Sequence, residues 1–218
     1  MLIALGGVLD RHEVEAIREA AADLDFADGR ATAGPLAREA KRNEQAAASP
    51  ALEAILAQAR ARLSAHPLFA SAARPRRFAR LLLSRYGPGM AYGAHVDDAL
   101  MGGCRTDLSF TLFLSGEGDH DGGALVIDDA LEERAIRLPA GDAILYPSGA
   151  VHRVEPVTRG TRLAIVGWVE SWVRDPGRRE ALFDLDRAVE EARAAGSAAL
   201  ARRLAKVRSN LLRMWAAD

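Results

Sequence analysis

Three residues at two places in the chain have the types and spacing of a metal site. His95 and Asp97 are separated by one residue at the end of a short predicted strand, and residues i and i+2 of a strand point to the same face. A second imidazole is available at His152, where a later run begins. Two histidines and one carboxylate on one side of a metal leave the opposite positions open, and this arrangement suits iron(II) oxygenases.

A His-x-Asp pair alone is weak evidence, because such pairs are common on protein surfaces. An arginine strengthens it: Arg162 lies in the run Thr161–Trp168, which is apolar enough for a central strand. A charge buried in such a strand must be paired, and a planar guanidinium suits a carboxylate held by two parallel hydrogen bonds. An internal salt bridge is the alternative, and the nearby His-Asp-His set favours a bound carboxylate instead.

These residues need strands to position them, and the sequence pattern in the middle of the chain is typical of a β-rich domain. Short apolar runs alternate there with Gly, Pro and Asp, as in a sandwich or jelly roll. The predicted strands are Phe78–Tyr86, Ala94–Asp97, Leu108–Ser115, Ala124–Asp128, Ala135–Leu138, Ala143–Tyr146, His152–Val157 and Arg162–Glu170. Alternation is clearest from Asp107 to Ser115, where the apolar face carries Leu108, Phe110, Leu112 and Leu114. The other face, with Ser109 and Thr111, is polar enough to line a mouth.

The region before the strands, Met1–Arg76, is predicted to be mainly helical. Asp10 and Glu13 form a capping box, and Val14, Ile17 and Ala21 then share one face, before a turn at Asp28–Gly29. A second helix is expected over Pro50–Ser64, with Leu52, Ile55, Leu56 and Leu63 inward.

The region after the strands contains two further predicted helices. One starts at Asp175–Pro176, and Gly196–Ser197 separates it from a second. The second carries an apolar stripe formed by Leu200, Leu204, Val207, Leu211 and Met214. The simpler interpretation is that both helices pack on the strands, and the alternative is that the last stripe is a contact between subunits.

Composition narrows the class of protein. Hydrophobic residues make up 49% of the 218 residues, enough for a full core. A formal net charge of −1 gives no reason to expect a nucleic-acid partner, and the arginines of Arg74–Arg80 are read as solvated surface. The single cysteine, Cys104, excludes an intrachain disulfide, and no run reaches the roughly 18 apolar residues of a membrane span. Without a secretory signal at Leu2–Leu9, the expected compartment is the cytoplasm.

The segment Arg85–Asp97, together with His152 and Arg162, resembles the prolyl-4-hydroxylase-like iron(II)/2-oxoglutarate oxygenases. Within that family it is similar to the bacterial PKHD-type hydroxylases. Further stretches support this narrower resemblance: Asp28–Gly34, Lys41–Gln45, Asp107–Leu114, Val173–Asp175 and Leu182–Asp186. The resemblance therefore extends over nearly the whole chain.

The resemblance implies an α+β protein whose double-stranded β-helix, or jelly roll, spans 77–174, between helical regions at 1–76 and 175–218. His95, Asp97 and His152 would ligate Fe2+, and Arg162 would hold the distal carboxylate of 2-oxoglutarate. Tyr86 matches a tyrosine that reaches this co-substrate in related prolyl hydroxylases.

The implied reaction is the hydroxylation of an unactivated C–H with O2, releasing succinate and CO2, and L-ascorbate would keep the iron reduced. The primary substrate is not readable, although some relatives are associated with iron uptake, which suggests a siderophore-linked role.

Two departures from the family pattern stand out. Ala124 occupies a position where many relatives have glutamate, and Phe113 falls where oxygen-sensing prolyl hydroxylases place a co-substrate-binding tyrosine. Thr111 or Ser109 could replace the lost hydroxyl contact. Trp168 is expected either to wall the pocket or to fill the core.

Three other classes of protein remain open at this point. A cupin-like metal-binding or sensing module would use the His-Asp-His set without turnover, but would not need Arg162. A zinc hydrolase would need a positioned general base, and the motif strands offer no second carboxylate for it. The third is a structural role dominated by the helical flanks. We also expect Asp98–Thr106 to act as a lid, and His12, His66 and His120 to lie on the surface.

Overall fold

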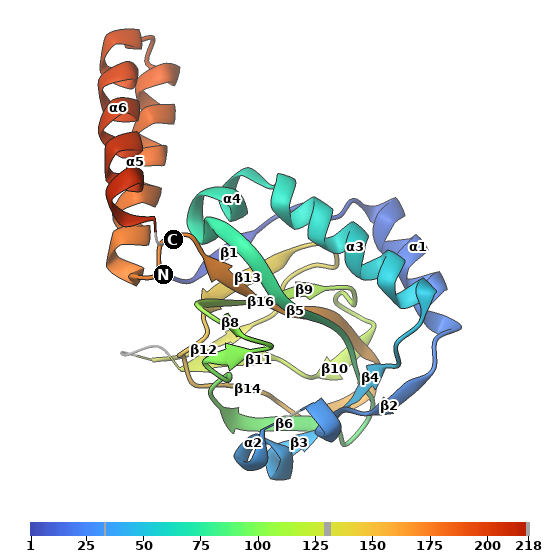
Figure 1. The fold of residues 1–218 in the computed structure, drawn as a ribbon. Coiled ribbons are helices and arrows are strands. Elements are labelled where there is room, and N and C mark those ends of the chain that lie inside the picture. Colours follow the sequence, from blue (N-terminus) through green and yellow to red (C-terminus); the bar gives the residue numbers. More distant parts are fainter. Residues whose placement is uncertain (33, 129–131, 217–218) are drawn as a thin grey trace.

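Two antiparallel β-sheets form the centre of the protein, in a computed structural model that describes residues 1–32, 34–128 and 132–216 (Figure 1). Within those residues one sheet has seven strands in the order β1-β13-β9-β16-β5-β4-β2, and the facing sheet has five in the order β12-β11-β14-β6-β3. Neighbouring strands come from distant parts of the sequence. This is the predicted jelly roll, with helices at both ends of the chain.

The seven-stranded sheet contains β1 (Ile3–Leu5), β2 (Phe26–Asp28), β4 (Glu44–Ala46), β5 (Pro75–Tyr86), β9 (Leu108–Phe113), β13 (Ala143–Pro147) and β16 (Arg162–Ser171). The five-stranded sheet contains β3 (Lys41–Arg42), β6 (Ala91–His95), β11 (Leu125–Asp128), β12 (Glu133–Ile136) and β14 (His152–Val154). Two separate pairs join β7 (Leu100–Met101) to β8 (Cys104–Arg105) and β10 (His120–Gly122) to β15 (Val157–Gly160).

Helices precede and follow the sheets. They are α1 (Arg11–Ala22), α2 (Pro35–Ala40), α3 (Pro50–Ala65), α4 (Pro67–Ala73), α5 (Pro176–Ala194) and α6 (Ala198–Trp215), with a short 3-10 helix at Gly29–Thr32. The capping box at α1 is present, because Asp10 accepts from the Glu13 amide and Glu13 accepts from the Asp10 amide. The helix ends at Ala22 rather than at the predicted Asp28–Gly29 turn. Phe26–Asp28 pairs with β4 instead, and a three-residue strand is too short to show periodicity.

Alternation along β9 and β5 gives the seven-stranded sheet two different faces. The outer face packs under α1, α3 and α4, where Phe69 stacks edge-on against Phe110 at a centroid distance of 6.0 Å. This main core also holds Leu108, Leu112 and Leu114, as predicted. The inner face carries Ser109, Thr111 and Ser84 toward the other sheet, so the polar side chains line the space between the sheets.

The segment 41–46 connects the two sheets. Lys41 pairs with Tyr92 of β6 in the five-stranded sheet, and Gln45 pairs with Ser84 of β5 in the seven-stranded sheet. This crossing closes one end of the space between the sheets. Its alternate residues Lys41, Asn43 and Gln45 are 5–6% exposed, so a row of polar side chains is buried there.

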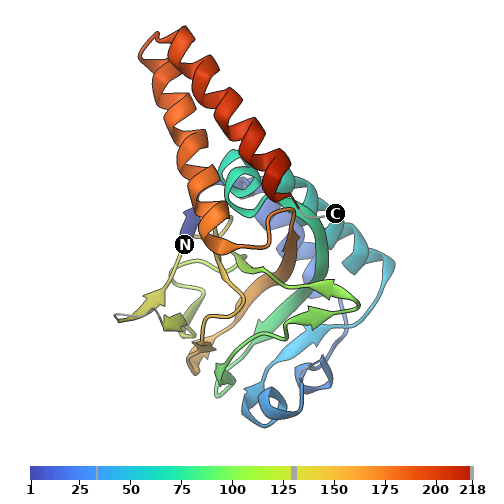
Figure 2. The same cartoon turned by 60° about the vertical axis from the view of Figure 1, so that its left-hand side comes forward.

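The last two helices form an antiparallel hairpin that extends away from the sheets, with only its base beside them (Figures 1 and 2). Helix α5 packs against α4 and α6, and its Leu182 and Val189 are buried. The interpretation that both helices pack on the strands is wrong, since α5 packs against α4 instead. On α6, Leu200, Val207 and Met214 are 46%, 44% and 72% exposed. Among the described helices, none is both long and apolar enough to cross a membrane.

Candidate active site

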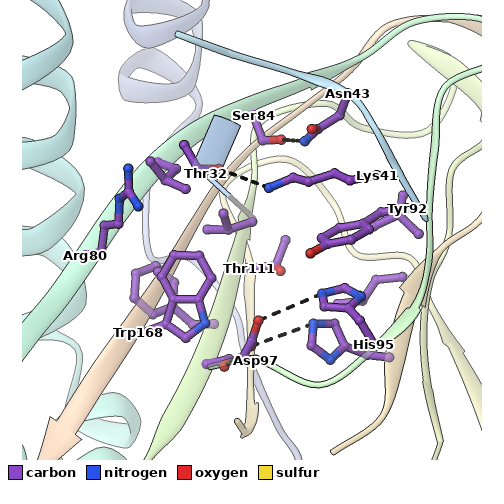
Figure 3. Close-up of a pocket in the computed structure, with 18 of the residues that line it drawn as sticks. Thr32, Lys41, Asn43, Arg80, Ser84, Tyr92, His95, Asp97, Thr111 and Trp168 are labelled. Carbon is purple, nitrogen blue, oxygen red and sulfur yellow. Dashed lines mark hydrogen bonds and ion pairs between the residues drawn. The ribbon is translucent and has the colours of Figure 1, made fainter. Parts of the chain in front are cut away.

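The predicted metal-binding residues meet in the space between the sheets. His95 ends β6 and His152 begins β14, and the two are paired across the strands, with ring centroids 4.2 Å apart. Asp97 lies just beyond β6, which ends two residues earlier than predicted. Its carboxylate oxygens approach His95 Nε2 at 3.9 Å and His152 Nε2 at 3.7 Å (Figure 3). One potential ligand atom from each residue lies within 4.8 Å of the others.

Both imidazoles are oriented by the backbone. Nδ1 of His95 lies 2.9 Å from the Gly93 carbonyl and Nδ1 of His152 lies 3.0 Å from the Ala150 carbonyl. Each Nδ1–H therefore donates to a carbonyl, which leaves the Nε2 lone pair facing the cluster. Burial, with the adjacent His152, lowers the pKa of His95 to about 4, so the ring is neutral at physiological pH. Two imidazoles that present Nε2 and a carboxylate fit a divalent cation with open positions, as iron(II) oxygenases require.

A hydroxyl relay holds Asp97. Ser109 Oγ lies 2.6 Å from Asp97 Oδ2 and 2.8 Å from Ser148 Oγ. Because a hydroxyl has one proton, Ser148 donates to Ser109 and Ser109 donates to the carboxylate. Both serines are fully buried, at 1% and 2% exposed. Ser109 thus orients a metal-site carboxylate, and its predicted use as a substitute for the missing tyrosine is not what its contacts support.

Arg162 is a buried cation without an acidic partner. It is 2% exposed, and no carboxylate of the described residues lies within salt-bridge distance of it. Its guanidinium carbon lies 5.4 Å from the ring centroid of Tyr86 and 5.5 Å from that of Phe113, and its Nε has no hydrogen-bond partner. An internal salt bridge, the alternative, is therefore not formed. A buried guanidinium of this kind needs an anion from outside the chain.

Two buried tyrosines surround that guanidinium. Tyr86 is 4% exposed, and burial raises its pKa. Tyr146 of β13 is equally buried, and burial, with the charge of Asp97, raises its pKa well above the usual value. Both hydroxyls therefore stay protonated and able to donate. Tyr146 was not predicted as a site residue, although it ends a predicted strand with its side chain directed inward, which was a usable signal.

The polar row on the segment 41–46 was also missed. Lys41, Asn43 and Gln45 line the same pocket, and Lys41 Nζ lies 5.0 Å from the ring centroid of Tyr92. The Tyr92 ring in turn stacks on His95 at a centroid distance of 3.6 Å. Residues 41–45 are all polar, so the sequence offers no alternation that could have indicated which of them face inward.

The remaining predicted residues lie near the pocket or at the surface. Trp168 and Met101 line the pocket, and Met101 belongs to the β7–β8 pair within the segment predicted as a lid. His12 is exposed, whereas His66 caps α4 by accepting from the Phe69 amide. His120 is half-buried beside the Gly122 carbonyl.

Comparison with known proteins agrees with this geometry. The sequence model of the 2OG-Fe(II) oxygenase superfamily matches residues 81–170, and that of the PKHD-type hydroxylase C-terminal domain matches residues 177–217. The chain is 48% identical to a PKHD-type hydroxylase of Maricaulis maris over the full length of both proteins. It is 47% identical to one from Picosynechococcus sp., covering 99% of each.

Solved structures share the fold. A Pseudomonas putida prolyl-4-hydroxylase, 23% identical, superposes with a TM-score of 0.55 over 78% of this chain and 92% of that one. HygX from Streptomyces hygroscopicus, 16% identical, superposes with a TM-score of 0.59 over 79% and 84%. The chain therefore belongs to the PKHD-type hydroxylases, a family of dioxygenases within the 2OG-Fe(II) oxygenase superfamily.

Proposed function

We propose that this protein uses iron(II), 2-oxoglutarate and O2 to hydroxylate an unactivated C–H of a primary substrate, with release of succinate and CO2. One observation carries the proposal: a buried, unpaired Arg162 shares a pocket with the His95–Asp97–His152 cluster. Neither feature alone specifies the reaction. Together they offer a site for a divalent cation and a site for a dicarboxylate beside it.

The chain's own residues position the reactants. His95, Asp97 and His152 would hold iron(II) from one side, and the Ser148–Ser109 relay keeps the Asp97 carboxylate in place. Bound iron(II) would supply the oxidising chemistry, in which one oxygen atom of O2 enters the substrate and the other enters succinate. Tyr92 and Tyr146 flank the histidines and limit access of water to this side of the cluster.

Arg162 would bind the distal carboxylate of 2-oxoglutarate through its fork of N–H groups. Tyr86, next to the guanidinium, is proposed as a second contact to the co-substrate, with Tyr146 in place of the hydroxyl absent at Phe113. The solved HygX complex contains nickel and 2-oxoglutarate, which supports the pairing of a metal with this co-substrate in the fold.

Several finer expectations belong to the same proposal. L-ascorbate would return over-oxidised iron to iron(II), and the cytoplasm would provide a reducing compartment for it. A link to iron uptake is the working hypothesis for the physiological role. Residues 77–174 would form the catalytic unit, flanked by the regions 1–76 and 175–218.

A homo-oligomer through α6 is a further expectation. Its apolar side chains Leu200, Val207 and Met214 are exposed and lie on a hairpin that projects from the body. Light scattering would give the mass in solution. A dimer that Val207→Glu converts to a monomer supports the expectation, and a monomeric wild-type protein removes it.

The competing function is a cupin-like metal-binding or sensing module without turnover. This function accounts for the His95–Asp97–His152 cluster but leaves Arg162 as a buried charge without a role. A zinc hydrolase is less consistent still, because the remaining acidic residue that lines the pocket, Asp98 at its rim, is exposed and is not buried beside the cluster as a general base would be.

The test is succinate formation by protein loaded with iron(II) without oxygen and then given 2-oxoglutarate and O2. We expect iron-dependent turnover even without primary substrate, and a fall of about tenfold or more with Arg162→Ala, because a charged hydrogen-bond donor to the co-substrate is lost. Arg202→Ala, at an exposed position on α6, is the matched control and should match the wild type. Absence of turnover, with neither iron(II) nor 2-oxoglutarate bound, would leave the metal module as the better account.

A further inference from the structure

We infer that the primary substrate carries a carboxylate, held by Lys41 and Arg80 at the end of the pocket away from Arg162. This rests on the proposed function, since it names the substrate class of the same site. The carboxylate itself is unchanged in the reaction: the C–H nearby becomes C–OH with one oxygen atom of O2, and 2-oxoglutarate provides the two electrons as it forms succinate and CO2.

Lys41 is a buried cation with too few partners. The residue is 6% exposed, and among the described residues Nζ makes one hydrogen bond, to Thr32 Oγ1 at 3.2 Å. No carboxylate of the described residues lies within salt-bridge distance of it. Burial lowers the pKa of Lys41 to about 8, so the ammonium remains the main form at neutral pH. Burying a charge without a counter-ion is costly, and a substrate carboxylate would remove that cost.

Arg80 supplies a second cation to the same cavity. Arg80 lines the pocket from β5, at an exposed position opposite Trp168 in the strand pairing. Its side chain forms no hydrogen bond or ion pair with any other described residue. Its charge adds to the field at Lys41 and lowers the pKa there. In Figure 3, Lys41 and Tyr92 form one side of the cavity and Arg80 and Trp168 the other. A ligand between these sides would meet both cations.

The unused hydrogen-bonding groups here are mostly donors. Trp168 Nε1 is buried without a partner, and Lys41 has spare N–H groups. Gln45, which also lines the pocket, accepts from Thr32 through Oε1, so that its amide nitrogen remains as a donor. One buried acceptor among the described residues also has no partner, Asn43 Oδ1, which lies against Gly29. A set of convergent donors suits an oxyanion.

Charge balance separates this ligand from 2-oxoglutarate. The two carboxylates of the co-substrate and that of Asp97 are offset by iron(II) and Arg162. Among the side chains that line the pocket, Lys41 and Arg80 then remain against Asp98, which lies at the rim at an exposed position. The charge of Asp28 also acts on Lys41, but Asp28 is paired with Arg30. One positive charge is left over, which one further carboxylate would neutralise.

The position of Lys41 also fits hydroxylation close to the carboxylate. One aromatic ring separates its ammonium from the metal cluster: Nζ lies 5.0 Å from the Tyr92 centroid, and that ring stacks 3.6 Å from the ring of His95. A carboxylate at Lys41 would therefore lie about one ring's width from His95, so that a C–H a few bonds from the carboxylate would reach the cluster. The substrate class that follows is a small or terminal carboxylate with its reactive C–H within a few bonds.

The test measures binding of trifluoroacetate and of its neutral isostere trifluoroacetamide by 19F NMR. The protein is loaded with iron(II) and saturating 2-oxoglutarate, without oxygen. We expect saturable binding of the carboxylate over the amide, and a dissociation constant raised about tenfold or more by Lys41→Met, because a charged hydrogen bond is lost. Lys41→Arg, which keeps the positive charge, should still bind the carboxylate. Lys206→Met, at the chain's other lysine and on the exposed surface of α6, is the matched control and should match the wild type.

Arg80→Gln provides a second variant at an exposed position, in case Lys41→Met does not fold. It should weaken the carboxylate by a smaller factor, and Arg202→Gln should not. Equal binding of acid and amide, unchanged binding in both pocket variants, or displacement of the probe by more 2-oxoglutarate would each overturn the inference. A failure of the proposed function is distinguishable, because iron-dependent succinate formation by the wild type is measured separately.

Discussion

The pocket and the C-terminal hairpin depart from ordinary burial in opposite directions. Around the pocket, charged and polar side chains are buried, with Lys41, Ser109 and Arg162 all at most 6% exposed. On α6 the reverse holds, because Leu200 and Met214 are 46% and 72% exposed. Each pattern is costly for an isolated chain, and each indicates a missing partner: anions and a metal for the pocket, an apolar surface for the hairpin.

The two regions also differ in how they are held. Pocket residues come from strands of both sheets and are fixed by many backbone contacts. The hairpin joins the body through a polar cluster at Asp186, which accepts from Ser71 at 2.5 Å, Arg74 at 2.6 Å and Arg208 at 2.7 Å. Changes in the pocket should therefore alter chemistry more than stability, and changes at Asp186 the reverse.

The largest expected effect is at Asp97. Asp97→Ala removes the carboxylate ligand and should reduce iron-dependent succinate formation to background, while the thermal unfolding midpoint falls little or rises, because a buried charge is removed. Asp184→Ala, at an exposed position on α5, is the control for turnover. Retained turnover in Asp97→Ala would show that Asp97 is not a metal ligand. It would also contradict the view that changes in the pocket alter chemistry more than stability.

A smaller effect is expected from Ser109→Ala. The Asp97 carboxylate would lose its donor, and affinity for iron(II) should fall by about tenfold, the usual cost of losing an outer hydrogen bond to a metal ligand. Competition with a chromophoric chelator measures that affinity without turnover. Ser64→Ala, at an exposed position on α3, is the matched control. Equal affinities in the two variants would show that the relay does not orient Asp97.

The smallest effect on turnover is expected from Asp186→Asn, which should instead lower the free energy of unfolding by about 2 kcal/mol through its weakened charged hydrogen bonds. Burial opposes ionisation of Asp186, yet the bonds from Ser71 and Arg208 outweigh it, and its pKa lies below the ordinary value. Its stabilisation is therefore complete above the unfolded pKa, near 4, and is lost as pH falls through the lower folded pKa.

Chemical denaturation at pH 6 and near pH 3 measures this difference. The gap between wild type and Asp186→Asn should be full at the higher pH and smaller at the lower one. A gap that is independent of pH would contradict the assignment of the stabilisation to the Asp186 charge. A large loss of succinate formation in the variant would contradict the view that the hairpin is attached to the body independently of the pocket.

The sequence predicted those features that depend on short spacings. The His95-x-Asp97 pair, the alternation of Leu108 to Leu114 and the capping box at Asp10 are local patterns, and the structure has each of them. His152 and Arg162 were singled out by residue type and by their places in later apolar runs, and the resemblance to a family supported their connection to the pair.

Features that depend on long-range contacts were not predicted. The hydrogen bond from Ser109 to Asp97 exists only once the two sheets face each other. Tyr146 comes close to Arg162 only once β13 and β16 join the same sheet. The strands around Lys41 are two and three residues long, too short for any period to be visible. The direction of α6 could not be read from its stripe, because an apolar face does not specify what covers it.

The most direct test of the whole account is a crystal structure of the protein with iron(II) and 2-oxoglutarate, grown without oxygen and measured at the iron absorption edge. We predict an anomalous peak between His95 Nε2, Asp97 and His152 Nε2, with the distal carboxylate of 2-oxoglutarate on Arg162 and the space beside Lys41 left free for the substrate. Iron bound elsewhere, or 2-oxoglutarate seated on Lys41, would contradict it.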